Sequence, residues 1–396
     1  MLKLLRYLAV AIIPALLVAC SDNSSSSMTN TPAESKSDNS SSSMTNTPAE
    51  PKFAAKLYDT SYENFKLNGL DIPLARNYGF RWGGNPTAVT YGDFLKEGEL
   101  SIAQAHENYA WGIGGTPYAD ILNNPSEYAS EVRIYKVNED KSVVAEVSIK
   151  GGCLMPRKLL TADFNKDNIP DIFMVCTGYD NPPYPGEKNM LIMSVSRGQY
   201  TISEVGEVAF HHGASAADVN NDGYPDVVTV HHNNIYFYIN QKDGTFTKDM
   251  TRVSYSLPQH GAYFNLELID LDKDGILDII SGGDEFNGAV TMIFYGNADG
   301  TFGTRTKTLP AVEKWGLVQD FTLIGSKLIL DRTPDPEHVM GSYYGYMVQM
   351  IDLITNQSEI LGSVTPAPPR MWFLPKTRNG VIGVGPFDNS DFYPLL

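Results

Sequence analysis

The sequence predicts an all-β fold, a β-propeller of four-stranded blades that follows a disordered tether. Two observations predict it. An acidic nine-residue pattern recurs with starts at Asp163, Asp218 and Asp270, which are 55 and 52 residues apart. Short apolar or β-branched runs flank each copy, so each unit is expected to form strand, tight loop, strand. A period of about fifty residues with four short strands is typical of a propeller blade.

The first nineteen residues have the pattern of a signal peptide. Basic residues precede an apolar run at 8–18, which is too short to be a membrane-spanning helix. The run LVAC at 17–20 resembles the bacterial lipobox, which implies acylation of Cys20, with palmitate among the acyl chains. An ordinary cleaved signal with a chance cysteine is the alternative. By the same resemblance, Ser21 implies anchoring in the outer membrane. Whether the folded domain faces the periplasm or the cell exterior stays open.

Residues 20–52 are expected to form a flexible tether. The fourteen residues at 21–34, SDNSSSSMTNTPAE, recur unchanged at 37–50. This segment lacks apolar periodicity, so no burial offsets the entropy that ordering would cost. A coil of about thirty residues spans roughly 30 Å. The folded part, expected over 53–396, would therefore stand clear of the membrane.

The chain is acidic, with a net charge of −16. This charge disfavours nucleic acid as a partner, so we expect none, and it limits membrane contact to the lipid anchor. It also favours cation binding. Apart from Cys20, the chain has Cys153 and Cys176. They fall near the far ends of the strands around Asp163, and an oxidising compartment would allow them to form a disulfide.

The three acidic loops have the spacing of a calcium site. Ca²⁺ takes six to eight oxygen ligands on a flexible scaffold, and side chains at positions 1, 3, 5 and 9 of a tight turn would converge on it. Position 6 carries Asn168, Gly223 or Gly275, which tolerate a left-handed backbone, and a carbonyl at position 7 is expected to point inward. Simple polar turns are the alternative, although four such groups would repel one another without a cation. The predicted ligands of about three Ca²⁺ ions are Asp163, Asn165, Asp167, Ile169, Asp171, Asp218, Asn220, Asp222, Tyr224, Asp226, Asp270, Asp272, Asp274, Ile276 and Asp278.

This pattern resembles a known repeat. Asp-x-Asp/Asn-x-Asp-Gly-x-x-Asp followed by an apolar strand resembles the FG-GAP or VCBS repeat of integrin α-subunit propellers and bacterial surface proteins. An EF-hand loop instead has Glu at position 12, where this chain has Met174, Thr229 or Ser281 inside a strand-like run. The resemblance implies a propeller fold and calcium in the loops. Adhesins, lectins and accessory domains of enzymes share it, so it fixes no single function.

Weaker copies extend the register to six blades. They begin at Asp93, Asp320 and Pro375, lack ligands at position 3 or 9, and are expected to hold no metal. Residues 53–85 could supply the outer strand of the last blade, and a count of seven stays open if they form a degenerate blade. The long gap between the first two copies predicts an insertion across 106–128.

A second landmark follows each strong loop. Arg-Gly or Asp-Gly pairs at 197–198, 243–244 and 299–300 are typical of hairpin turns. The aromatic residue two positions after each pair is expected to pack between sheets. The segment 179–189, YDNPPYPGEKN, is either a contact loop or a long hairpin connection.

Histidines are expected at the strand ends opposite the acidic loops. Counting symmetrically from the loop centre places His212 across from His232. Such a rim could contact a polar ligand such as a sugar or bind a transition metal. Alternatively, the histidines cap blade ends by bonding to the backbone. The residues of this predicted rim are His211, His212, His231, His232 and His260.

Taken together, these features predict a calcium-stabilised, membrane-anchored binding or adhesion module that recognises a glycan or a protein on its loop face. The sequence contains no Gly-x-Ser-x-Gly, no His-Glu-x-x-His and no phosphate loop, and the repeats occupy nearly all of the folded part. One alternative is a polysaccharide lyase or hydrolase that uses the histidine rim. Another is a scaffold subunit of an envelope assembly. The ligand itself stays open.

Overall fold

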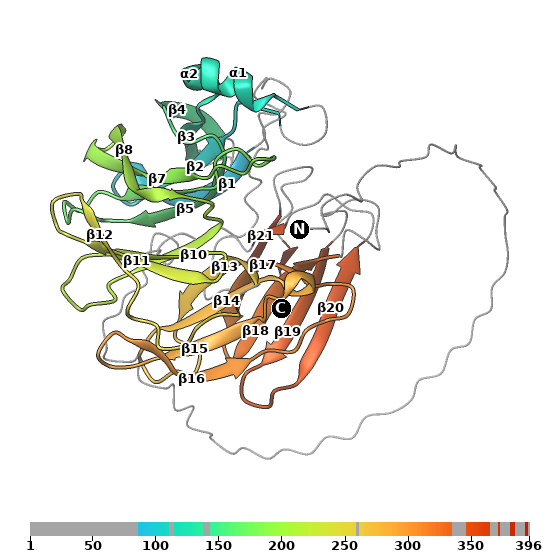
Figure 1. Ribbon diagram of the computed structural model, residues 1–396. Helices are drawn as coiled ribbons and strands as arrows, with labels where there is room; N and C mark the ends of the chain where they lie inside the picture. The colour runs from blue at the N-terminus through green and yellow to red at the C-terminus, as the bar shows by residue number, and fades with distance from the viewer. Residues whose placement is uncertain are drawn as a thin grey trace, which may run out of the picture. The chain divides into compact units, whose positions relative to one another are not determined.

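The part of the chain that the computed structural model describes is almost entirely antiparallel β-sheet (Figure 1). The predicted signal peptide, the tether and residues 53–85 lie outside it. Within the described ranges, no helix is long and apolar enough to cross a bilayer. The described residues are 86–110, 115–137, 143–258, 261–334, 346–364, 371–372, 381–384 and 393–394.

Consecutive strands pair into four-stranded sheets in chain order. The first sheet comprises β1 (Pro86–Lys96), β2 (Glu99–His106), β3 (Glu131–Val137) and β4 (Val143–Lys150). The second comprises β5 (Pro156–Ala162), β6 (Asp171–Cys176), β7 (Glu187–Ser196) and β8 (Gln199–Ala209). The third comprises β9 (Gly213–Ala217), β10 (Asp226–His231), β11 (Asn234–Asn240) and β12 (Phe246–Asp249).

The same order continues toward the C-terminus. The fourth sheet comprises β13 (Ala262–Ile269), β14 (Asp278–Asp284), β15 (Met292–Gly296) and β16 (Phe302–Thr308). The fifth comprises β17 (Leu317–Ile324), β18 (Lys327–Thr333), β19 (Tyr346–Asp352) and β20 (Ser358–Val364), and the pair Asp284 and Leu317 joins it to the fourth. A shorter sheet comprises β21 (Met371–Trp372), β22 (Val381–Val384) and β23 (Tyr393–Pro394).

The first strands of successive sheets lie beside one another. β1 contacts β5, β5 contacts β9, β9 contacts β13, β13 contacts β17, and β17 contacts β21. Each later strand lies one step further from these inner strands within its own sheet. This is the architecture of a β-propeller, so the predicted fold class is confirmed. The number of blades stays a prediction, because 53–85 and most of 365–396 lie outside the described residues.

The apolar core lies between neighbouring sheets. One cluster packs the first sheet on the second, and the others join the second to the third, the third to the fourth and the fourth to the fifth. The aromatic residues after the outer turns take part as predicted. Tyr200 contacts Phe94 of the first sheet at 6.5 Å between ring centroids, and Phe302 contacts Phe237 of the third at 5.7 Å. Burying such a ring stabilises the fold by about 1.5–3 kcal/mol.

The predicted insertion is present between β2 and β3. It contains α1 (Tyr118–Asn123) and α2 (Pro125–Tyr128), and Ile121 of α1 packs against Tyr109, Met155 and Tyr179. The described part has one further helical segment, the 3-10 turn η3 (Glu285–Asn287). The insertion therefore lengthens the first blade without adding a strand to it.

Two of the weaker repeat copies are tight turns instead of open loops. β1 continues through Asp93 and turns at 97–98, and β17 continues through Asp320 and turns at 325–326. The glycines of these turns take φ angles of 72° and 62°. Because no ligand-like side chains need to converge there, a two-residue turn closes each hairpin. The copy at Pro375 lies outside the described residues.

Candidate metal loops and ligand rim

Each acidic loop connects the first two strands of its sheet: β5 to β6, β9 to β10, and β13 to β14. Position 6 is left-handed as predicted, with φ of 65° at Asn168, 90° at Gly223 and 89° at Gly275. Position 12 of each loop lies inside β6, β10 or β14, which agrees with the exclusion of an EF-hand. A second left-handed residue occupies position 4 of each loop, which the sequence reasoning missed. These residues are Lys166 (φ 62°), Asn221 (58°) and Lys273 (62°).

In the first two loops, the polar side chains largely satisfy one another. The amide nitrogen of Asn165 donates to Asp167 at 2.9 Å, and that of Asn220 donates to Asp222 at 3.2 Å. The backbone N–H at position 5 donates to the position-1 carboxylate at 3.0 Å in both loops. The carboxylate at position 5 also accepts the backbone N–H of position 7, at Ile169 and Tyr224. Asparagine at position 3 therefore closes each of these loops on itself.

The third loop has aspartate at position 3, so it has no side-chain amide there to bond to the position-5 carboxylate. Within the described residues, one group of three acidic side chains has potential ligand atoms that all lie within 4.8 Å of one another: Asp270, Asp272 and Asp278. Oxygens that share one Ca²⁺ at about 2.3–2.6 Å lie at most about 5 Å apart. Buried Oδ1 of Asp270 has no hydrogen-bond partner in the described part of the chain. This donor set fits a hard dication.

The electrostatics of the third loop favour a bound cation. Burial raises the pKa of Asp270, and the negative charges of Asp274 and Asp272 raise it further. One cation from the protein is already close, because Arg305 of β16 forms an ion pair with Asp272 and lies 3.6 Å from the centroid of the Tyr295 ring. The N–H of Ile276 donates to Asp274 at 2.8 Å, as in the other loops.

The aspartates at position 9 have a second role that the sequence reasoning missed. Each is buried and accepts two backbone N–H groups, one from position 2 of its loop and one from β7, β11 or the end of β15. For Asp226 these donors are Val219 at 3.0 Å and Asn240 at 2.8 Å. Burial raises the pKa to about 6 for Asp171 and to about 7 for Asp226 and Asp278. These carboxylates tie the inner hairpin to the third strand, and each oxygen keeps a lone pair for a metal.

His211 does not lie on the rim where it was predicted. Its side chain is fully buried, and its Nδ1 and Nε2 lie 3.3 Å from Thr229 Oγ1 and 3.4 Å from Tyr238 Oη. Because Thr229 donates to the Gly213 carbonyl, the consistent assignment has Nδ1–H donating to Thr229 and Tyr238 donating to Nε2. Burial lowers the pKa of His211 to about 3. Both ring nitrogens are used inside the blade, so His211 is a structural residue.

The other predicted rim histidines lie at the strand ends, with a corrected register. Val230 pairs with Gly213, so His212 is level with His231 and not with His232. His231 and His232 have ring centroids 4.3 Å apart, and His212 instead contacts Phe210 and Phe264. The described histidines form no group of metal-binding geometry within the described ranges. His260 lies outside the described residues.

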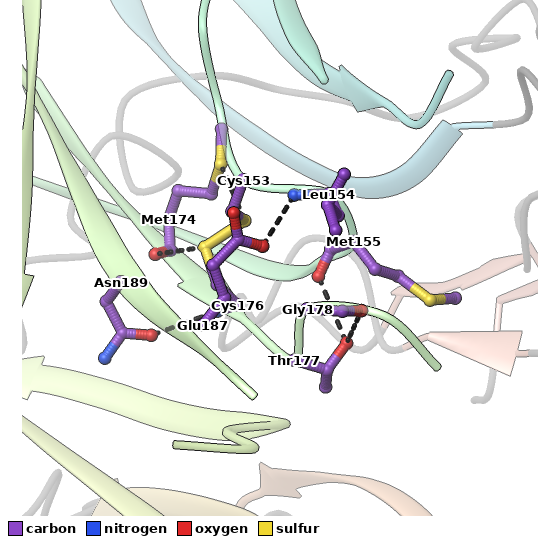
Figure 2. The surroundings of a disulfide bond; sticks show 9 residues. All are labelled: Cys153, Leu154, Met155, Met174, Cys176, Thr177, Gly178, Glu187 and Asn189. Atoms are coloured by element: carbon purple, nitrogen blue, oxygen red, sulfur yellow. Dashed lines mark hydrogen bonds between the residues drawn. A yellow bond between two sulfur atoms is a disulfide. The ribbon is translucent and has the colours of Figure 1, made fainter. Parts of the chain in front are cut away.

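A disulfide joins Cys153 to Cys176 at this end of the second blade (Figure 2). Cys176 ends β6, and its backbone carbonyl accepts the N–H of His211 at 3.1 Å. Beside the disulfide, Glu187 accepts the N–H of Leu154 at 2.7 Å. Burial raises the pKa of Glu187 to about 7. The disulfide therefore fastens the segment from which the loop between β6 and β7 departs.

That loop, predicted as either a contact loop or a hairpin connection, is an ordered connection to β7 that packs on the insertion. Tyr179 stacks on Tyr118 with ring centroids 4.8 Å apart, and its hydroxyl donates to the Thr116 carbonyl at 2.9 Å. Asp180 forms an ion pair with Arg157. The loop thus has a fixed base and carries Tyr184 at its exposed part.

Comparisons with known proteins give one family match and several structures that are similar at low identity. Residues 218–281 match the FG-GAP-like repeat family, and no curated protein sequence matches the chain. A periplasmic gluconolactonase of Pseudomonas aeruginosa is similar in structure over 78% of this chain and 84% of its own, with 11% identity and a TM-score of 0.47. A lectin of Agrocybe aegerita that recognises non-reducing terminal N-acetylglucosamine is similar over 58% and 67%, with 19% identity and a TM-score of 0.33.

A protein from Lactobacillus plantarum is similar over 73% of this chain and 87% of its own, with 13% identity and a TM-score of 0.35. The family match covers the second acidic loop and the third, together with the strands that flank them. Each of these loops joins the first two strands of its own sheet. The chain has a β-propeller fold, and its residues 218–281 match an FG-GAP-like repeat.

Proposed function

We propose that this protein is a calcium-stabilised binding module, anchored in the cell envelope through Cys20, that recognises a glycan or a protein on its loop face. The observation that carries the calcium part is the third acidic loop. Its three carboxylates come within 4.8 Å of one another, and a buried oxygen of Asp270 has no hydrogen-bond partner in the described part of the chain. A dication would relieve both the repulsion and the unmet hydrogen-bonding capacity.

The bound ion would have a structural role. Asp270 and Asp272 follow β13, and Asp278 begins β14, so an ion held by all three would fasten the inner hairpin of the fourth blade. The two other loops have the same backbone shape, but their asparagines at position 3 already bond within the loop. We therefore expect the third loop to bind Ca²⁺ most tightly.

The binding part of the proposal rests on the division between a rigid frame and its loops. The acidic loops stabilise one end of the blades, and the connections at the other end present aromatic and amide side chains from neighbouring blades. Loops on a rigid frame are common binding sites in proteins. The polysaccharide-cleaving alternative depended on the histidine rim, and the enclosed His211 is not placed to act there.

Titration calorimetry of the mature chain with Ca²⁺ tests the metal part. We expect binding that Asp270→Ala weakens at the tightest site. Asp299→Ala is the matched control, because Asp299 is an exposed aspartate in the turn between β15 and β16, and it accepts hydrogen bonds from the nearby Thr301. An equal loss of Ca²⁺ affinity in both variants, or no heat of Ca²⁺ binding in the wild type, would contradict the assignment.

The ligand and the anchor need separate measurements. A glycan array and a pull-down from envelope extract distinguish a sugar ligand from a protein partner, and stable co-purification with several envelope proteins would favour the scaffold alternative. Incorporation of labelled palmitate that disappears in Cys20→Ser would support the anchor. Protease treatment of intact cells would then report which face of the membrane carries the domain.

A further inference from the structure

A row of aromatic rings crosses the loop face from the second blade to the fourth. Tyr184, in the connection between β6 and β7, contacts Phe210 with ring centroids 5.9 Å apart. Phe210 contacts His212 at 4.9 Å, and His212 contacts Phe264 of β13 at 5.6 Å. The Tyr184 side chain is 55% exposed, and the other three residues are half-buried. The rings thus form one connected surface from three blades.

The buried His211 explains why the row forms. His211 points inward and is held by Thr229 and Tyr238. Its neighbours on either side, Phe210 and His212, are half-buried, and their rings contact each other at 4.9 Å. The N–H of His211 also donates to the carbonyl of Cys176, which fixes this segment to the disulfide-bonded end of β6.

Backbone strain marks the same surface independently. Tyr184 and His232 both have a φ of 53°, in the left-handed region that bulky side chains rarely adopt. The other described non-glycine residues with positive φ lie in the acidic loops or are Lys or Asn. Strained residues persist where the surrounding structure holds them, and they are concentrated at ligand sites. Here the two residues with this backbone conformation, Tyr184 and His232, each carry an aromatic ring on an exposed loop.

The segments that form the row carry no formal charge of their own. The segments 181–186, 210–213, 232–234 and 261–265 contain no Asp, Glu, Lys or Arg, although 19% of the chain is charged. Their polar groups are neutral amides, hydroxyls and imidazoles. Beneath them, burial lowers the pKa of His231 to about 4, so this imidazole is neutral as well. A charged ligand that lies on these segments would lose hydration there without gaining a counter-charge from them.

We propose that this aromatic row, formed by Tyr184, Phe210, His212 and Phe264, binds a neutral glycan. The faces of aromatic rings are electron-rich, and the C–H groups on the flat face of a pyranose ring carry partial positive charge. The sugar hydroxyls would exchange hydrogen bonds with the amides of Asn233 and Asn234 at the next turn. The inference rests on the proposed binding function and narrows it to one ligand class and one surface.

An array of neutral hexasaccharides tests the inference on the full mature chain with Ca²⁺ present. The probes are hexamers of glucose, xylose, mannose and N-acetylglucosamine, with hexagalacturonate as the charged comparison. We expect one neutral hexamer to bind. Tyr184→Asn keeps a residue that tolerates the left-handed backbone but removes the ring, and we expect it to weaken binding about tenfold or more. Tyr184→Phe should retain most of the affinity.

Two further variants separate ligand contact from folding. Phe210→Ala should weaken binding as Tyr184→Asn does. Tyr255→Ala is the matched control, because this tyrosine is 42% exposed and lies beside Gly303, near the turn between β15 and β16. It should bind as the wild type does. Melting curves of all variants show whether each is folded, and the exposed position of Tyr184 makes its variant the decisive one.

The outcomes distinguish this inference from the proposed function. Neutral binding that Tyr184→Asn leaves unchanged would overturn the location and leave the function standing. Preference for hexagalacturonate would overturn the argument from the uncharged surface. Capture of an envelope protein without any glycan binding would overturn the ligand class but not the binding function. Neither glycan nor protein bound would overturn both.

Discussion

Removal of the Cys153–Cys176 disulfide is expected to lower the free energy of unfolding by about 3 kcal/mol. The bond closes a loop with a sequence separation of 23 residues. The loop-closure entropy that such a crosslink removes from the unfolded chain corresponds to about 3.4 kcal/mol at 25 °C. Both cysteines are buried, so the double variant Cys153→Ala with Cys176→Ala also loses some packing. The assay is urea denaturation of the mature chain, followed by tryptophan fluorescence.

The single variants provide the control for this experiment. Each breaks the crosslink while keeping one sulfur in the core, so each should lose nearly as much stability as the double variant. Thiol titration of denatured, non-reduced wild-type protein should detect neither Cys153 nor Cys176. A double variant within 1 kcal/mol of the wild type would refute the reasoning, because the crosslink would then contribute little to stability.

Three further predictions follow from buried groups. Because burial raises the pKa of Glu187 to about 7, its contribution to stability is complete below the unfolded pKa of about 4.3 and is lost as the pH rises through 7. Glu187→Gln should flatten the fall in melting temperature between pH 5 and 8, and an unchanged slope would contradict this. Phe246→Ala should lower the free energy of unfolding by about 3 kcal/mol, because its ring packs on two phenylalanines of the preceding sheet. Val208 is 59% exposed, so Val208→Ala should change this free energy little in the same denaturation assay. Asp226→Asn should lower the free energy of unfolding by about 1–3 kcal/mol even with a chelator present, because one of two backbone N–H groups loses its acceptor. A loss of stability seen only with Ca²⁺ present would contradict this.

The sequence was sufficient to predict the repeated units of strand, loop and strand, because local chemistry determines them. Asp-rich loops with glycine or asparagine at position 6 have few alternatives to a left-handed turn between two strands, and all three copies fold that way. The aromatic residues after the outer turns were also predictable, because a large apolar side chain beside a turn has only the neighbouring sheet to pack on. Lys166 and Lys273 at position 4 were not, because lysine shows no preference for the left-handed region.

Properties that depend on strand register or on contacts between distant residues could not be predicted from the sequence. The predicted pairing of His212 with His232 was one residue out of register, because the pairing of Val230 with Gly213 places His212 level with His231. In a strand, such a shift exchanges the inner and outer faces, and the burial of His211 was therefore missed. The difference among the acidic loops was hidden as well, because it depends on the amide of Asn165 bonding to Asp167, which spacing alone does not specify.

The most direct test of the central claim is the calcium content and melting temperature of the purified mature chain, before and after EDTA. If acidic loops hold Ca²⁺ between inner strands, the protein should contain up to three ions per chain and should melt at a lower temperature in EDTA. At a concentration one hundred times its Kd, each bound ion stabilises the fold by about 2.7 kcal/mol. Added Ca²⁺ should restore the original melting curve. A chain free of calcium, with the same melting curve in EDTA and in Ca²⁺, would contradict the account.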